Sequence, residues 1–182
     1  MKKGVLFLLG ILLIAGGMAG SKTFASLAAA EERNDDGDDR GRGPRNPVIL
    51  SFDTMVGVDG PYKGATNPIR GINGGGAPWV IAEGRGVLKA DGSLRVKVRG
   101  LVIPISPFNG TNPSATFRAT VSCMTIDELG NATVENVQTA AFPANTLGDA
   151  NIKEKIDLPS PCIAPIIFVT SAGGAWFSAT GH

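Results

Sequence analysis

The stretch from Ala115 to Ile126 reads ATFRATVSCMTI and decides the fold class. Every second side chain along it is apolar: Phe117, Ala119, Val121 and Cys123. The side chains between these positions are Arg118, Thr120 and Ser122. A period of two residues is that of a β-strand, because successive side chains of a strand point to opposite faces. We therefore expect a strand here with one buried face.

Runs of the same kind continue from Val48 to His182 and are separated by Gly, Pro, Asn and Asp. The expected strands are Val48–Val56, Trp79–Ala82, Gly86–Lys89, Ser93–Ile103, Ala115–Ile126, Ala132–Phe142, Asn151–Leu158, Ile163–Ser171 and Ala175–Thr180. No apolar stripe at helical spacing is long enough for a helix of three turns. The pattern predicts an all-β domain built as an antiparallel two-sheet β-sandwich, with a partly closed β-barrel as the alternative.

The local sequence predicts two turns and one central strand. Asp91-Gly92 predicts a tight hairpin turn, because this pair supplies the positive backbone angles that such turns need. Gly173-Gly174 predicts a second chain reversal. The run from Ile166 to Val169 lacks alternation, which predicts a central strand covered on both faces, whereas the other strands are expected to be buried on one face only.

The N-terminal stretch Met1 to Ala30 has the pattern of a secretory signal. Lys2 and Lys3 precede an apolar run, and small residues end at Ala30 with the spacing of a cleavage site. We expect cleavage after Ala30, with Ala25 as the alternative. A retained anchor is the competing interpretation, but the apolar run is shorter than the roughly 20 residues of a spanning helix. The pattern predicts a secreted or envelope-associated protein that meets the membrane only through its export signal.

Residues 31–47 form a charged segment without a large apolar side chain, which predicts a disordered linker. The β-sandwich domain is then expected to span residues 48–182. The whole chain has a formal net charge of +1. Because nucleic-acid binders usually carry a strong basic excess, we expect no nucleic-acid partner.

Cys123 and Cys162 are the two cysteines of the chain, and both fall in the expected exported domain. An even number of cysteines in an oxidising compartment predicts a disulfide between them. A redox-active or metal-binding pair is the alternative, but it requires C-x-x-C proximity or histidine partners.

Histidine occurs once in the sequence, as His182. This argues against a Ser-His-Asp triad, a Cys-His pair or a histidine metal site. We therefore predict a protein that is not an enzyme and has no catalytic residues, metal site or cofactor. One catalytic alternative needs no histidine, namely glycoside cleavage by a carboxylate pair such as Asp53 and Glu83. Separated acids on strands are more often solvated or paired with Arg.

Gly57 to Pro78 is a connection rich in Gly and Pro, and loops of this length are usually functional or disordered. Tyr62 and Arg70, together with Lys63 and Trp79, are its candidate contact residues. A mobile loop without a partner is the alternative.

Arg95, Lys97 and Arg99 alternate with apolar residues, so their side chains must emerge from one face of a sheet. Arg118 would join them if its strand were a neighbour. A row of charges roughly 7 Å apart suits repeating phosphate or carboxylate groups. The alternative is charge pairing with acidic residues between Asp127 and Asp157.

These observations predict a non-catalytic binding or adhesion module. Its expected partner is an anionic cell-wall or matrix polymer or another extracellular protein. The candidate binding surface comprises Tyr62, Arg70, Arg95, Lys97, Arg99 and Arg118. The alternative is a structural protein that assembles with copies of itself, and the sequence does not decide the oligomeric state.

Two short stretches, Gly86 to Leu94 and Val137 to Pro143, resemble segments of CHRD-type extracellular β domains. The histidine-containing motif of those domains is missing from this chain. We therefore assign the chain to no family on this resemblance.

Overall fold

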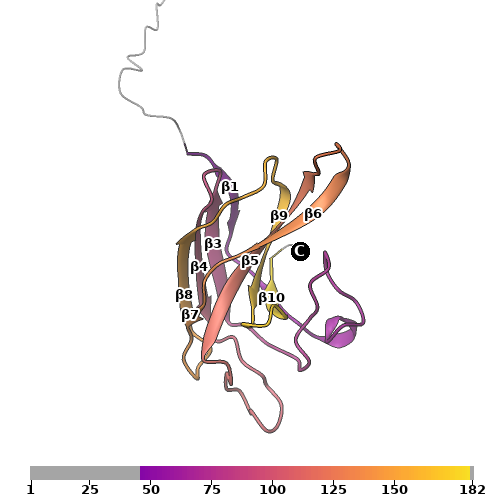
Figure 1. Ribbon diagram of the computed structural model, residues 1–182. Coiled ribbons are helices and arrows are strands. Elements are labelled where there is room, and N and C mark those ends of the chain that lie inside the picture. The colour runs from indigo at the N-terminus through magenta and orange to yellow at the C-terminus, as the bar shows by residue number, and fades with distance from the viewer. Residues whose placement is uncertain (1–45, 181–182) are drawn as a thin grey trace, which may run out of the picture. The chain divides into compact units, whose positions relative to one another are not determined.

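A computed structural model describes residues 46–180, which form two antiparallel β-sheets packed together (Figure 1). The expected export signal and nearly all of the expected linker lie outside the described residues. The elements are β1 (Val48–Phe52), β2 (Val56–Gly57), the 3-10 helix η1 (Gly60–Tyr62), β3 (Glu83–Lys89), β4 (Ser93–Arg99), β5 (Thr116–Ile126), β6 (Ala132–Gln138), β7 (Phe142–Pro143), β8 (Ala150–Lys155), β9 (Ile163–Thr170) and β10 (Trp176–Ala179). The prediction of an all-β sandwich is confirmed.

Sheet A contains four strands in the order β1-β3-β4-β8, and sheet B has the order β2-β10-β9-β5-β6. The short strand β7 pairs with β5 at one end of sheet B. Among residues 46–180, no helix has the length and apolarity needed to cross a membrane.

Some expected strands are divided or shortened. The run Val48–Val56 is split, so that β1 lies in sheet A and β2 in sheet B. The run that starts at Ser93 ends at Arg99, because Gly100 takes a φ of +62° that a strand cannot accommodate. Trp79–Ala82 is not a strand, and its one ladder contact is an isolated bridge between Val80 and Val102.

The core lies between the two sheets. Sheet A contributes buried side chains that include Leu88, Leu94, Val96, Val98 and Ile152. Sheet B contributes Phe117, Ala119, Val121, Ile167 and Val169. Trp79 stacks on Phe177 with ring centroids 4.0 Å apart, and both rings make edge contacts with Phe117.

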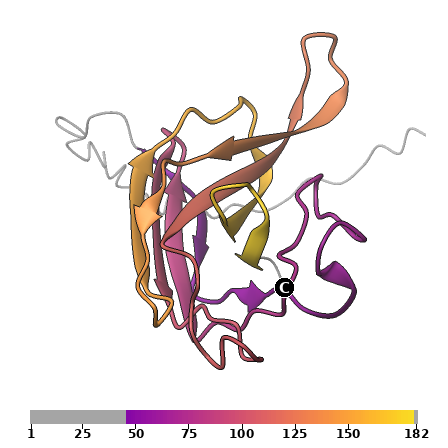
Figure 2. The ribbon, with the colours of Figure 1, turned by 60° about the horizontal axis from the view of Figure 1, so that its bottom comes forward.

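Part of the second face of sheet B is buried as well. The prediction that β9 is covered on both faces is confirmed, since Ile167, Phe168 and Val169 are all fully buried. The expectation that β5 is buried on one face only is wrong, because Thr120 and Ser122 on its other face are fully buried too. The reason is tertiary: the connection from Gly57 to Pro78 lies against β10 and extends over this face (Figure 2).

The β3–β4 hairpin turns at the predicted place but with different geometry. Gly92 has a φ of +82°, whereas the φ of Asp91 is not positive. The Gly92 N–H donates to the Lys89 carbonyl at 3.0 Å, and Asp91 accepts from both the N–H and the hydroxyl of Ser93 at 2.9 Å. The turn therefore needs one left-handed residue, as in a three-residue hairpin loop. The reversal at Gly173-Gly174 also forms, with a φ of +89° at Gly174.

The predicted disulfide between Cys123 and Cys162 is present, with Cα atoms 4.9 Å apart. It joins β5 to the start of β9, beside a register shift between Ser122 and Met124. A structural disulfide is typical of proteins that fold in an oxidising compartment.

Arg70 forms hydrogen bonds to both strands at the same irregularity. Its two terminal nitrogens donate to the carbonyls of Ser122 and Ala164, each at 2.8 Å. Ser122 belongs to β5 and Ala164 to β9, and both lie at the register shift, where the regular ladder is interrupted. The guanidinium therefore connects the long loop to both β5 and β9.

Candidate binding face

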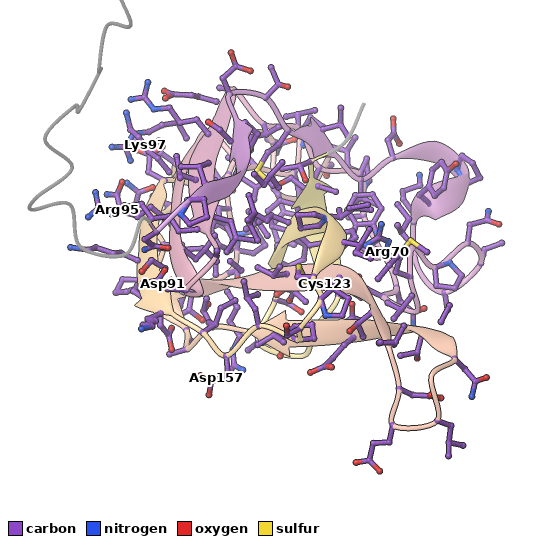
Figure 3. The ribbon with its side chains drawn as sticks, turned by 90° about the horizontal axis from the view of Figure 1, so that it is seen from above. Arg70, Asp91, Arg95, Lys97, Cys123 and Asp157 are labelled. Atoms are coloured by element: carbon purple, nitrogen blue, oxygen red, sulfur yellow. A yellow bond between two sulfur atoms is a disulfide. The ribbon has the colours of Figure 1, made fainter. Side chains whose placement is uncertain are left out.

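The outward face of sheet A is strongly basic. The neighbouring strands β3, β4 and β8 are in antiparallel register, which places alternate side chains of each strand side by side on the solvent face. The basic residues of this face are Arg85, Lys89, Arg95, Lys97, Arg99, Lys153 and Lys155. Arg95 and Lys97 project from the same side of the molecule in Figure 3, and Arg70 lies well away from them.

Two adjoining hollows run along this face, each of about 470 Å³. They share Val87, Arg95 and Lys153, so we treat them as one basic groove. The remaining charged residues that line it are Asp53, Arg85, Lys89, Lys97, Glu154 and Lys155. Glu154 is engaged elsewhere, because its carboxylate accepts the Ala140 N–H at 2.8 Å.

Ion pairs neutralise the margins of the face. Glu83 Oε1 lies 2.9 Å from Arg85 Nε and 3.5 Å from Lys97 Nζ. Two further pairs are looser: Arg99 with Asp149 at 3.9 Å, and Lys155 with Asp91 at 3.8 Å. The expected pairing with the acidic stretch between Asp127 and Asp157 therefore holds for Arg99, while Lys97 uses an acid of its own sheet.

Two basic residues at the centre of the groove, unlike those at its margins, have no acidic partner among residues 46–180. Arg95 of β4 is the direct cross-strand partner of Lys153 of β8, and its neighbour on β3 is Val87. Within residues 46–180, neither Arg95 nor Lys153 forms an ion pair or a side-chain hydrogen bond. Two like charges therefore face each other across a strand pair, an arrangement that costs stability in the absence of an anion.

Arg118 does not belong to this row, which corrects the sequence-based expectation. It lies on β5 of sheet B, opposite Thr170 of β9. Because its neighbours Phe117 and Ala119 face the core between the sheets, Arg118 points away from sheet A. Its charge therefore lies on the other side of the sandwich.

The candidate residues of the long loop are also placed away from the groove. Trp79 is buried in the aromatic cluster and is no contact residue. Arg70 is occupied by two backbone carbonyls, so it holds the fold together and does not present a free charge. Tyr62 remains 47% exposed at the end of η1.

The loop is attached to sheet B by backbone hydrogen bonds. Gly75 donates to Trp176 at 2.8 Å and Trp176 to Asn73 at 2.9 Å, so the loop is hydrogen-bonded to β10. At Gly74 a Cβ atom would collide with the Tyr62 carbonyl, which explains a glycine at this close approach.

The two carboxylates considered for glycoside cleavage both lie beside Arg85 and Lys97, which line the groove. Glu83 is held by Arg85 and Lys97, whereas Asp53 lines the groove. In residues 46–180, no group of three or more His, Cys, Asp or Glu side chains is placed to hold a metal ion.

Hydrogen bonds stabilise the charge of Asp91 beside the groove. They lower the pKa of Asp91 from 3.8 to about 2, first through the Ser93 N–H and then through Asn46 and the Ser93 hydroxyl. The pKa of Asp127 is also lowered, chiefly by the backbone and side chain of Asn131 in the β5–β6 turn.

Sequence reasoning missed Lys153 as a groove residue. It belongs to a stretch in which acids outnumber bases, so composition alone assigns it to an acidic region. Its alternation with Ile152, which is buried, was the one available signal that it faces outward.

Comparisons with protein-family models, curated protein sequences and solved structures found no match to this chain.

Proposed function

We propose that this protein is a secreted or envelope-associated binding module, without catalytic activity, that holds an anionic cell-wall or matrix polymer in the basic groove of sheet A. The export pattern of residues 1–30 and the disulfide between Cys123 and Cys162 support the location. The binding proposal rests on one observation: Arg95 and Lys153 are cross-strand neighbours in the groove, and neither has an acidic partner among the described residues.

The groove suits an extended ligand better than a small one. It continues through two hollows along the sheet, and cations recur on neighbouring strands. Strand geometry separates alternate side chains by roughly 7 Å, which suits repeating carboxylate or phosphate groups. Each exposed contact contributes little, so binding is cumulative and sensitive to salt.

The test compares retention of the mature protein on immobilised polyglutamate and on an immobilised phosphate-containing wall polymer at low ionic strength. The test variant is Arg95→Gln/Lys153→Gln. The control is Lys63→Gln/Arg118→Gln, which removes the same charge from positions outside the groove.

We expect the control to elute near the wild type and the groove variant to elute at clearly lower salt. Equal elution of the two variants would show that retention follows net charge only, and the groove proposal would then be wrong.

Self-assembly is the second candidate, and one observation favours it. β6 is an edge strand of sheet B, and its hairpin with β5 extends beyond the neighbouring strands (Figure 2). Exposed apolar side chains gather near this hairpin: Met124, Ile126, Leu129, Val134 and Ile163. An exposed apolar edge strand is a template for pairing with another chain.

Sedimentation at several concentrations distinguishes the two candidates. Assembly through β6 is supported if the mass of the wild type rises with concentration through the micromolar range and the mass of Val134→Lys stays lower at the same concentrations. A constant monomer mass excludes it and leaves the binding module.

A further inference from the structure

A separate hollow, of about 290 Å³, lies on the opposite side of the sandwich from the basic groove. It is bounded by the long loop at Gly71–Asn73, by β6, and by the β9–β10 turn at Gly173–Ala175, and Thr120 of β5 lines it as well. Three segments that are distant in sequence therefore meet around one space on the outer face of sheet B.

The walls of this space carry three carboxamide side chains, so we call it the amide hollow. They are Asn73 of the loop and Asn136 and Gln138 of β6. Asn136 Nδ2 donates to the Arg70 carbonyl at 3.0 Å, which leaves its oxygen for other partners. The side chains of Asn73 and Gln138 form no hydrogen bond with any part of the chain from 46 to 180.

Strand β5 contributes Thr120 to the lining. Some polar groups of this strand have no hydrogen-bond partner among the described residues. The Thr120 hydroxyl pairs with that of Thr170 at 3.2 Å. On the same face of β5, the flanking residues Arg118 and Ser122 each have a buried atom, Nε and Oγ respectively, without a hydrogen-bond partner in the described chain. Buried polar groups are normally paired, and an ordered water that accepts from Arg118 Nε or bonds to the Ser122 hydroxyl would satisfy these two atoms, which lie beside the hollow and not in its lining.

The lining also defines which ligand would fit. No residue that lines the hollow is charged, and Ile72 and Ala175 add small apolar patches. Each carboxamide both donates and accepts, which matches vicinal hydroxyl groups, since each of these also does both. Pockets for drug-sized ligands measure about 300–1,000 Å³, so this one suits a smaller molecule.

We propose that the amide hollow binds a single neutral sugar unit, either free or at the end of a glycan. Gln138 and Asn73 supply hydrogen bonds from opposite walls, and Ile72 contacts the carbon face of the ring. The lining contains no aromatic side chain for stacking, so the affinity is millimolar. This site is independent of the basic groove, because it belongs to the other sheet and carries no charge.

The test is a titration of labelled mature protein, followed by amide NMR, with the methyl glycosides of glucose, galactose, mannose and N-acetylglucosamine. Linear oligomers of any sugar that binds form a second arm, which distinguishes a free sugar from a glycan end. We expect saturable shifts of the side-chain NH₂ signals of Asn73, Asn136 and Gln138 with at least one sugar at tens of millimolar. Inorganic phosphate at the same concentration should leave these signals unchanged.

Two variants and one control complete the design. Gln138→Leu and Asn73→Ala each remove one wall amide from an exposed position, and each should weaken binding at least several-fold. Thr133→Val makes a polar-to-apolar change elsewhere on β6 and should bind as the wild type does. Retention on the anionic polymer should be unaffected by all three changes.

The proposal is overturned if no sugar gives a saturable shift, or if Gln138→Leu and Asn73→Ala both bind as tightly as the wild type. Neither result bears on the basic groove, which is tested separately by the polymer columns.

Discussion

Arg95 on β4 and Lys153 on β8 are direct neighbours across a pair of antiparallel strands, and both are positively charged. Like charges in this position repel each other, and an acid opposite a base would be more stable. The fold therefore gives up some stability at the point where the groove is most basic. Such a trade is typical of binding surfaces, where the bound ligand supplies the missing charge.

The first prediction follows from this repulsion. Lys153→Glu should raise the free energy of unfolding by roughly 1 kcal/mol at low salt, because it converts a repulsive pair into an attractive one. The same variant should elute from the anionic polymer at lower salt than the wild type. Urea unfolding with and without added salt measures the first effect, and the gain should shrink as salt screens the pair. A Lys153→Glu variant that is no more stable than Lys153→Gln would contradict the predicted repulsion.

The disulfide gives the second prediction. Cys162→Ser should lower the free energy of unfolding by about 2–5 kcal/mol, because the loop between Cys123 and Cys162 is no longer closed in the unfolded chain. Thermal unfolding of the variant and of the wild type with and without reductant checks this. The intact mass of the wild type should be two hydrogens below the reduced mass. Native alkylation of both thiols would show that the bond does not form.

Arg70 gives the third prediction. Arg70→Met removes two charge-assisted hydrogen bonds to backbone carbonyls and should cost roughly 2–3 kcal/mol. Hydrogen exchange should rise in the long loop and in the neighbouring parts of β5 and β9. Lys63→Met, which breaks only the exposed pair with Asp59, should change stability by less than about 0.5 kcal/mol. An Arg70→Met variant as stable as Lys63→Met would mean that the loop is held by its backbone hydrogen bonds alone.

The fourth prediction concerns acid. Because hydrogen bonds lower the pKa of Asp91 to about 2, its contribution to stability is complete above the unfolded value near 4 and is lost as the pH falls from about 4 to about 2. The stability difference between the wild type and Asp91→Asn should therefore narrow over this range. NMR titration of the Asp91 carboxyl carbon should give a midpoint near 2. Asp157→Asn, which loses no hydrogen bond to residues 46–180, is the control, and an equal pH dependence in both variants would contradict the assignment.

Much of the fold could be predicted because its signals are local. Alternation at Phe117, Ala119 and Val121 indicates a strand whichever strands lie beside it. Two cysteines allow a single intramolecular pairing, so the disulfide needed no structure. Strand ends were less predictable, because a single residue such as Gly100 stops the ladder where the apolar pattern continues.

The candidate site was predicted in part. Arg95, Lys97 and Arg99 share a face as expected, since their spacing along one strand fixes this. Arg118 has the same local pattern, yet it lies in the other sheet. Only the pairing of strands could separate it from the row.

The sequence by itself determined the β class, the cysteine pairing and which side chains of one strand share a face. The β class and the shared faces follow from the two-residue period, and the pairing follows from the number of cysteines. Tertiary structure alone decided which faces are joined: Lys153 beside Arg95, the long loop over β5, and Gln138 across a hollow from Asn73. The physical reason is that neighbours on a sheet are set by hydrogen-bond register between distant strands. That register depends on the packing free energy of all the strands together, and no short stretch of sequence contains it.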